Sequence, residues 1–123
     1  MRSQATDLGP LVSEAQRDKV AGYATAALRQ PGVRALSGGV DDPRAIAASA
    51  AHGGGWWFAP TVLDGCDAGS EVAQEEVFGP LVTLHPFESE AQAVALANGT
   101  RYGTRIEPRR LFAGCRRYLA AVD

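Results

Sequence analysis

The chain has 123 residues, a length that suits one domain. A hydrophobic content of 46% and a charged content of 21% are typical of a globular protein and exclude an intrinsically disordered one. Twelve basic and fourteen acidic side chains give a net charge of -2, which argues against binding to nucleic acid or a membrane surface through a basic field.

Membrane insertion and secretion also lack support in the sequence. No apolar run approaches the roughly 20 residues that cross a bilayer, and the first residues lack the apolar core of a signal peptide. The two cysteines, Cys66 and Cys115, indicate neither a disulfide framework nor a metal cluster. We therefore expect a protein of the reducing cytoplasm, with no membrane partner, no nucleic-acid partner and no bound metal.

The first predicted element is a helix over 13–30. The stretch from Ser13 to Gln16 has the S-x-x-Q form of a capping box, in which the serine caps a backbone N–H and the glutamine reaches back. Apolar residues then recur at the spacing of one helix face, and Pro31-Gly32 ends the pattern.

Strands and short helices alternate along the rest of the chain, an order that indicates an α/β fold. Pro60 marks an edge position or an irregularity in the segment that contains it. The predicted elements are, in chain order, a strand over 33–36, a short helix or a loop from Pro43 to Ala51, an extended strand over 56–63, a helical turn over 71–77, a strand over 81–84 and a helix that opens at Ser89 and stops at Asn98.

Several residue groups could carry chemistry, and each also has a structural interpretation. The glycines at 53–55 lack the spacing and the lysine of a phosphate-binding loop, which favours a flexible connection. Cys66 with His52 or His85 could form the nucleophile and base of a small hydrolase. An unreactive thiol and a structural histidine are the favoured interpretation, because nothing in the spacing brings these residues together.

The run Glu75-Glu76-Val77-Phe78-Gly79-Pro80 places two acids, an aromatic ring and a Gly-Pro turn within six positions. A carboxylate beside a ring at the head of a strand can bind sugar hydroxyls and cover a flat heterocycle. The alternative is a solvated acidic turn with Phe78 in the core. The residue types alone leave both interpretations open.

The same run resembles the E-E-I/V-F-G-P signature of NAD(P)-dependent aldehyde dehydrogenases. The resemblance extends in register over about residues 7–103, and several ordered motifs make it specific. The other matching motifs are the G-P-L/V-I/V start at 9–12, the helix over 16–27, the pair Gly38-Gly39, the segment 57–63 and the final stretch 86–103.

The resemblance implies an α/β fold that is an incomplete fragment of the aldehyde dehydrogenase catalytic domain, truncated at both ends. It implies that Glu76 hydrogen-bonds the ribose hydroxyls on the nicotinamide side of NAD or NADP and that Phe78 packs near the nicotinamide ring. The parent family oxidises an aldehyde to a carboxylate through a cysteine thioester and forms homo-oligomers. The family's nucleophile, base and oxyanion donor would lie upstream, so we expect no catalytic residue in this chain and no activity from it alone.

A second hypothesis is a non-catalytic interaction module. Such a module would pair with a full-length relative or bind an acidic partner through its arginine-rich end. On either hypothesis, we expect the apolar faces of the helix over 13–30 and the strand over 81–84 to lack their partners and to be exposed.

The family pattern is lost after Gly103, which divides the chain into a partial catalytic domain over 1–103 and a divergent, arginine-rich tail over 104–123. Glu107-Pro108 argues against a strand in the tail. Apolar residues at helical spacing instead predict a short amphipathic helix over about 108–121.

Overall fold

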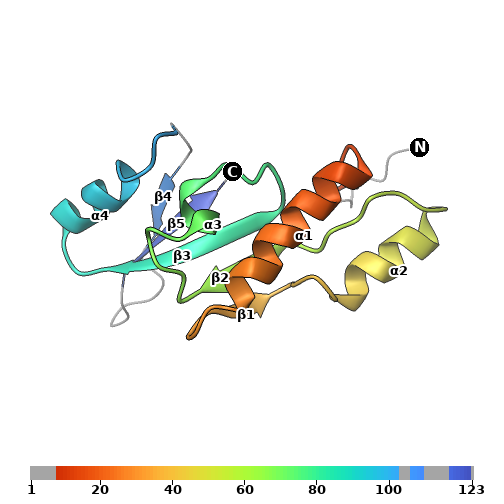
Figure 1. The fold of residues 1–123 in the computed structure, drawn as a ribbon, viewed down its shortest axis with the longest axis horizontal. Helices are drawn as coiled ribbons and strands as arrows, with labels where there is room; N and C mark the ends of the chain where they lie inside the picture. The colour runs from red at the N-terminus through yellow and green to blue at the C-terminus, as the bar shows by residue number, and fades with distance from the viewer. Residues whose placement is uncertain (1–7, 103–105, 110–116, 123) are drawn as a thin grey trace.

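The structure of the protein is a computed structural model that describes residues 8–102 in full and the backbone of residues 106–109 and 117–122. The described residues form a five-stranded sheet with helices around it, which confirms the predicted α/β class (Figure 1). The elements are, in chain order, α1 (Glu14–Leu28), β1 (Arg34–Ser37), α2 (Pro43–Ala51), β2 (Thr61–Asp64), α3 (Glu71–Gln74), β3 (Leu81–Phe87), α4 (Glu90–Ala97), β4 (Ile106–Arg109) and β5 (Arg117–Val122).

The sheet has the strand order β1-β2-β3-β5-β4. Strands β2 and β3 run parallel, with Thr61 opposite Leu81, whereas the other neighbouring strands pair antiparallel. Helix α1 crosses in front of β2 and β3 in Figure 1, and α2 and α4 lie at opposite ends of the molecule. The main core therefore forms between α1 and the centre of the sheet, where Val20 packs with Leu63 and Leu81.

Helix α1 confirms the helix predicted over 13–30, and the two ranges differ only by one residue at the start and two at the end. The Ser13 side chain caps it by accepting a hydrogen bond from the Gln16 backbone N–H at 3.2 Å. Its apolar face is covered, since Val20, Ala24 and Ala27 are all buried. The expectation that this face would be exposed is wrong, because β2 and β3 cover it within the same chain. The inward face of the strand predicted over 81–84 is buried in the same core.

The chain between α2 and β2 differs from its sequence-based prediction. The extended strand expected over 56–63 is a strand only from Thr61, and Trp56 makes one isolated bridge to Leu11. Pro60 has no backbone N–H to donate, and the Trp57 side chain folds back to donate to the Gly54 carbonyl. The uncertainty from Pro43 to Ala51 is resolved as a helix, α2.

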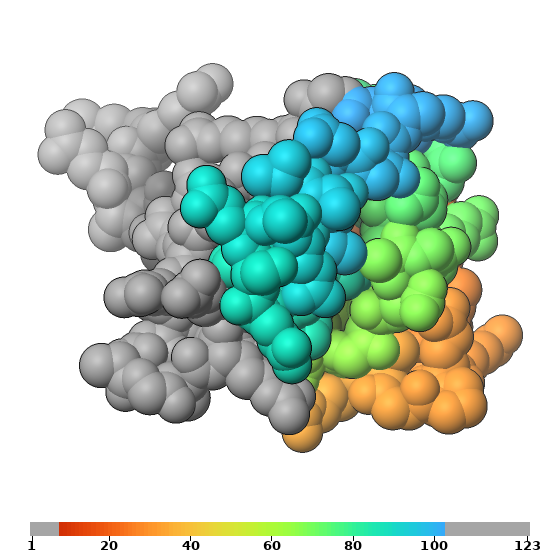
Figure 2. All heavy atoms as spheres, turned by 90° about the vertical axis from the view of Figure 1, so that its left-hand side faces the viewer, coloured from red at the N-terminus to blue at the C-terminus, as the bar shows by residue number. Residues whose placement is uncertain are grey.

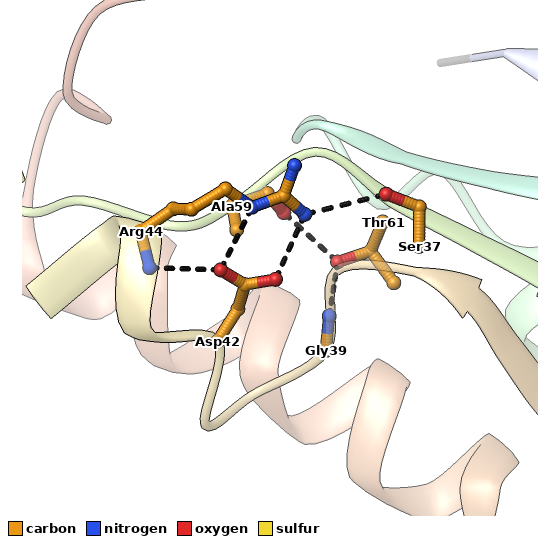
Figure 3. A network of polar contacts seen from close by, with 6 residues as sticks. All are labelled: Ser37, Gly39, Asp42, Arg44, Ala59 and Thr61. Carbon is orange, nitrogen blue, oxygen red and sulfur yellow. Dashed lines mark hydrogen bonds and ion pairs between the residues drawn. The ribbon is translucent and has the colours of Figure 1, made fainter.

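A polar network joins the end of β1 to the start of α2 (Figure 3). The buried Thr61 hydroxyl accepts from the Gly39 N–H at 2.9 Å and donates to the Ala59 carbonyl at 2.8 Å. Asp42 caps α2 and binds the Arg44 guanidinium at 2.8 Å, so its pKa is lowered mainly by that side-chain contact. The network thus ties the turn after β1 both to the start of β2 and to the cap of α2.

The predicted helix over about 108–121 is wrong where the structure describes it. Residues 106–109 form β4, 117–122 form β5, and the stretch 110–116 lies outside the described residues. Strand β5 pairs with β3 from Val82 to Phe87, so backbone groups that β3 would leave open along this edge are hydrogen-bonded. Pro108 is tolerated because β4 is the edge strand. In this part of the chain, the hydrogen bonds of β5 with β3 and β4 determine the structure, and the helical spacing of the apolar residues does not.

Exposed apolar side chains lie outside the buried face of α1. Val12 is 90% exposed, Ile46 on α2 is 68% exposed, and all four residues of β1 are exposed. Among the described helices, none combines the length and the apolar character needed to cross a membrane.

Candidate functional site

The acidic aromatic run predicted to be functional forms the connection from α3 to β3. Helix α3 ends after one turn because the backbone of Glu75 is extended, with φ -105° and ψ 151°. Gly79 lies so close to α1 that an added Cβ would overlap the Val20 side chain. The connection over 75–80, which we call the signature turn, is therefore held against the core by its backbone.

Glu75 is fixed by the chain segment that follows α4. Its carboxylate accepts hydrogen bonds from Arg101 Nη2 at 2.7 and 2.8 Å and from the Tyr102 hydroxyl at 2.8 Å. Arg101 also lies over the Tyr102 ring, 4.9 Å from its centroid. The Tyr102 hydroxyl and then Arg101 lower the pKa of Glu75 below its usual value of 4.5. Glu75 is thus an ionised anchor of the signature turn.

Glu76 differs from its neighbour in the surroundings of its carboxylate. Within the described part of the chain, no side chain or backbone group donates a hydrogen bond to that carboxylate, and its residue is half-buried. Its backbone carbonyl, by contrast, accepts from Lys19 Nζ at 2.9 Å. The backbone of Glu76 is therefore held by the protein, while its carboxylate is available to an external donor.

Phe78 presents its ring to solvent. The residue is 63% exposed and has a left-handed backbone with φ 54°, a conformation that costs an aromatic residue on the order of 1–3 kcal/mol. Gln16 Nε2 donates to the carbonyls of Val77 at 2.9 Å and of Phe78 at 2.6 Å, and these bonds hold the strained backbone in place. The alternative interpretation, with Phe78 in the core, is wrong.

Two residues of α1 that sequence reasoning did not assign to the site contact the signature turn. Gln16 was interpreted as the second member of a capping box, yet its amide donates to the turn. Lys19 Nζ lies 5.8 Å from the centroid of the Phe78 ring as well as on the Glu76 carbonyl. Their spacing of three residues places both on one side of the helix, but only the tertiary fold shows what that side faces.

The Cys/His candidates are not brought together. Cys66 is buried, and burial followed by the charge of Asp64 raises the pKa of its thiol. His52 ends α2 with Nδ1 on the Ala48 carbonyl, whereas His85 is buried on β3 beside Thr83. These surroundings support the interpretation of Cys66 as an unreactive thiol. Among the described residues there is no group of three or more potential ligands that could hold a metal ion.

Solved structures show the same arrangement of chain. The protein is similar to betaine aldehyde dehydrogenase from Staphylococcus aureus in complex with NAD+, with 35% identity and a TM-score of 0.70 over 83% of this chain and 19% of that one. An aldehyde dehydrogenase from Mycobacterium tuberculosis complexed with NAD+ matches with 35% identity and a TM-score of 0.68, over 81% and 19% of the two chains. The fold is thus a fragment of an α/β dehydrogenase.

Sequence comparison identifies the family. The chain is 42% identical over 98 residues to 5-carboxymethyl-2-hydroxymuconate semialdehyde dehydrogenase from Escherichia coli, covering 80% of this chain and 20% of that protein. It is 41% identical over 96 residues to 3,6-anhydro-alpha-L-galactose dehydrogenase from Streptomyces coelicolor, covering 78% and 18%. The model of the aldehyde dehydrogenase family matches residues 1–106, and the chain belongs to that family. It spans about a fifth of the length of these relatives.

Proposed function

We propose that the signature turn supplies the nicotinamide-side contacts of NAD or NADP in an aldehyde-oxidising protein. The observation that carries this proposal is the contrast between two adjacent carboxylates. Glu75 is held by Arg101 and Tyr102, whereas Glu76 has no described donor for its carboxylate and precedes by two residues Phe78, whose ring is exposed. A carboxylate without a protein partner next to an exposed ring fits a ligand that combines hydroxyls with a flat heterocycle.

Each residue of the turn has a role in this proposal. The Glu76 carboxylate accepts hydrogen bonds from the two ribose hydroxyls, and the Phe78 ring covers one face of the nicotinamide. Gln16 and Lys19 hold the turn by its carbonyls, so the two side chains keep a fixed relation. When bound, the cofactor supplies the acceptor for a hydride from the substrate. Fixing its ring matters because hydride transfer needs close alignment.

We propose that the aldehyde-oxidising protein to which the signature turn contributes converts an aldehyde to a carboxylate through a cysteine thioester. The 123-residue chain does not perform this reaction alone, because Cys66 is buried and its thiol has a raised pKa. Purified chain mixed with an aldehyde and NAD+ or NADP+ is expected to form no reduced cofactor. Aldehyde-dependent formation that is lost in Cys66→Ser would contradict this part of the proposal.

Cofactor contact is tested separately from turnover. Nicotinamide mononucleotide carries the ribose and ring that the turn would contact, and its binding to the chain can be followed by NMR line broadening. Glu76→Gln is expected to weaken binding about tenfold, the effect of losing charge on a paired acceptor. Glu71→Gln on α3 is the matched control and is expected to bind as the unaltered chain does. Equal binding by both variants, or equal binding of adenosine monophosphate, would refute the assignment.

A non-catalytic interaction module remains the second candidate, favoured by the exposed apolar side chains. Ile46 on α2 and Trp56 border a hollow of about 520 Å³ between α1 and α2 that is lined mainly by apolar residues. On this proposal the chain pairs with a copy of itself or with a full-length relative. Sedimentation of the purified chain, alone and with a full-length aldehyde dehydrogenase, tests it. Ile46→Glu should abolish the association, and a chain that sediments as a monomer in both samples would exclude it.

A further inference from the structure

A second cavity lies apart from the exposed face of the signature turn. It has a volume of about 380 Å³, opens to solvent, and is bordered by the segment 68–74, strand β3, helix α4 and the residues that follow α4. Helix α4 and the segment that contains α3 adjoin on the face shown in Figure 2. Most of its wall is apolar, formed by residues that include Ala73, Ala95 and Leu96. Its volume falls in the range of small-molecule sites, about 300–1,000 Å³.

His85 is the polar group that the wall of this cavity leaves unsatisfied. The residue is only 7% exposed, and its Nε2 lies 3.1 Å from the Thr83 hydroxyl. Burial lowers the pKa of His85, so the imidazole is neutral at neutral pH and has one donor nitrogen and one acceptor nitrogen. Within the described residues Nδ1 has no hydrogen-bond partner, although the ring lines the cavity.

Each of the other polar side chains named in the wall makes one hydrogen bond within the protein. Gln74 Nε2 donates to the Ala68 carbonyl at 2.6 Å, and Gln92 Oε1 accepts from the Glu88 N–H at 2.8 Å. The Thr100 hydroxyl donates to the Tyr102 carbonyl at 3.0 Å. Among the described residues, no acidic or basic side chain lines the cavity apart from the neutral His85. The wall therefore offers a charged ligand no opposite charge to compensate for the water that it loses.

We propose that this cavity binds a neutral ring compound with one hydroxyl, the chemical class of the phenols. With the Nε2 proton of His85 donated to Thr83, Nδ1 accepts a hydrogen bond from the ligand hydroxyl. The ring packs against the alanine and leucine side chains of α3 and α4. A rigid ring loses little conformational freedom on binding, so one hydrogen bond to Nδ1 can orient it against the apolar wall. The site is independent of the nicotinamide-side contacts proposed for the signature turn.

Phenol added to the full chain is the direct test. Long-range ¹⁵N–¹H NMR spectra resolve the imidazole nitrogens of the two histidines, so binding is read at His85 with His52 as an internal control. Phenol is expected to shift the His85 nitrogens with a saturable dependence on concentration. Anisole, which keeps the ring and oxygen but has no O–H, should bind about fivefold more weakly, the effect of one hydrogen bond. Benzoate should not bind.

A pair of variants on α4 tests the location without altering the buried histidine. Ala95 lines the cavity from an exposed helix position, whereas Ala91 lies exposed one turn earlier and does not line it. Ala95→Phe fills the cavity and should abolish the saturable shift, while Ala91→Phe should leave it unchanged. Equal responses from the two variants, a shift that does not saturate, or anisole binding as tightly as phenol would overturn the proposal.

Discussion

Gly79→Ala is expected to destabilise the protein through a single methyl group. A Cβ at this position would overlap Val20 Cγ2 and would lie 3.2 Å from Val20 Cγ1. Val20 is fully buried between α1 and the sheet, so its side chain has no space into which to turn. Forcing an extra methyl group into a packed core costs about 1–3 kcal/mol, and we expect a loss in that range.

A double-mutant cycle with Val20→Ala tests the cause. Val20→Ala alone should cost about 2 kcal/mol, because it removes two buried carbon groups and leaves a cavity. In the double variant the methyl group of residue 79 occupies part of that cavity. The two losses should therefore be less than additive by about 1 kcal/mol or more. Urea unfolding followed by fluorescence of Trp56 and Trp57 gives the free energies.

Gly22→Ala is the matched control for the glycine substitution. Gly22 lies in α1, where an added Cβ would meet nothing within 4 Å. Alanine is the better helix former there, so this variant should gain about 0.5–1 kcal/mol. A Gly79→Ala variant as stable as the unaltered chain, or strictly additive losses in the cycle, would show that the contact between the signature turn and α1 does not constrain the fold.

Three further predictions concern titratable groups. The ionised Glu75 contributes stability that is present above its usual pKa of 4.5 and is lost as the pH falls through its lowered pKa in the folded protein. Tyr102→Phe should raise the pKa of Glu75, measured by NMR titration of its carboxyl group. An unchanged pKa would contradict the assigned cause. Because the pKa of buried His85 is lowered, the unfolded chain takes up its proton first, and thermal stability should begin to fall below pH 6.5. Cys66 should react with a thiol reagent only as fast as the chain opens, and rapid labelling under native conditions would show that it is accessible.

The sequence predicted those elements that local signals determine. Ser13 and Ser89 both cap helices, as their motifs indicate, because a cap depends on residues three positions apart. The helical turn predicted over 71–77 is shorter in the structure, because α3 ends at Gln74 and the backbone of Glu75 is extended; the strand predicted over 81–84 lies within β3. What failed depends on pairing between distant segments, as in the tail, where β5 adopts a strand because β3 offers an edge.

The different roles of the two glutamates, and the residues that hold the signature turn, could not be predicted from the sequence. Nothing in the order of residues tells which of two consecutive glutamates is bound by Arg101, since that partner lies 26 positions further along the chain. The contacts of Gln16 and Lys19 with the turn are more distant still, at 62 and 57 positions in the sequence. The left-handed backbone of Phe78 had no local signal either, because such conformations usually take glycine.

The extended backbone at Glu75 has a consequence for the length of the connection that carries it. Successive side chains of an extended segment point to opposite sides, so with Glu75 bound to Arg101 we expect the Glu76 carboxylate to face away from that arginine. Inserting or deleting one residue between α3 and this pair would exchange the two orientations. Arg101 would then bind the carboxylate of Glu76, which the proposed function needs free. The number of residues between α3 and the two glutamates is therefore as important for this turn as the identity of its residues.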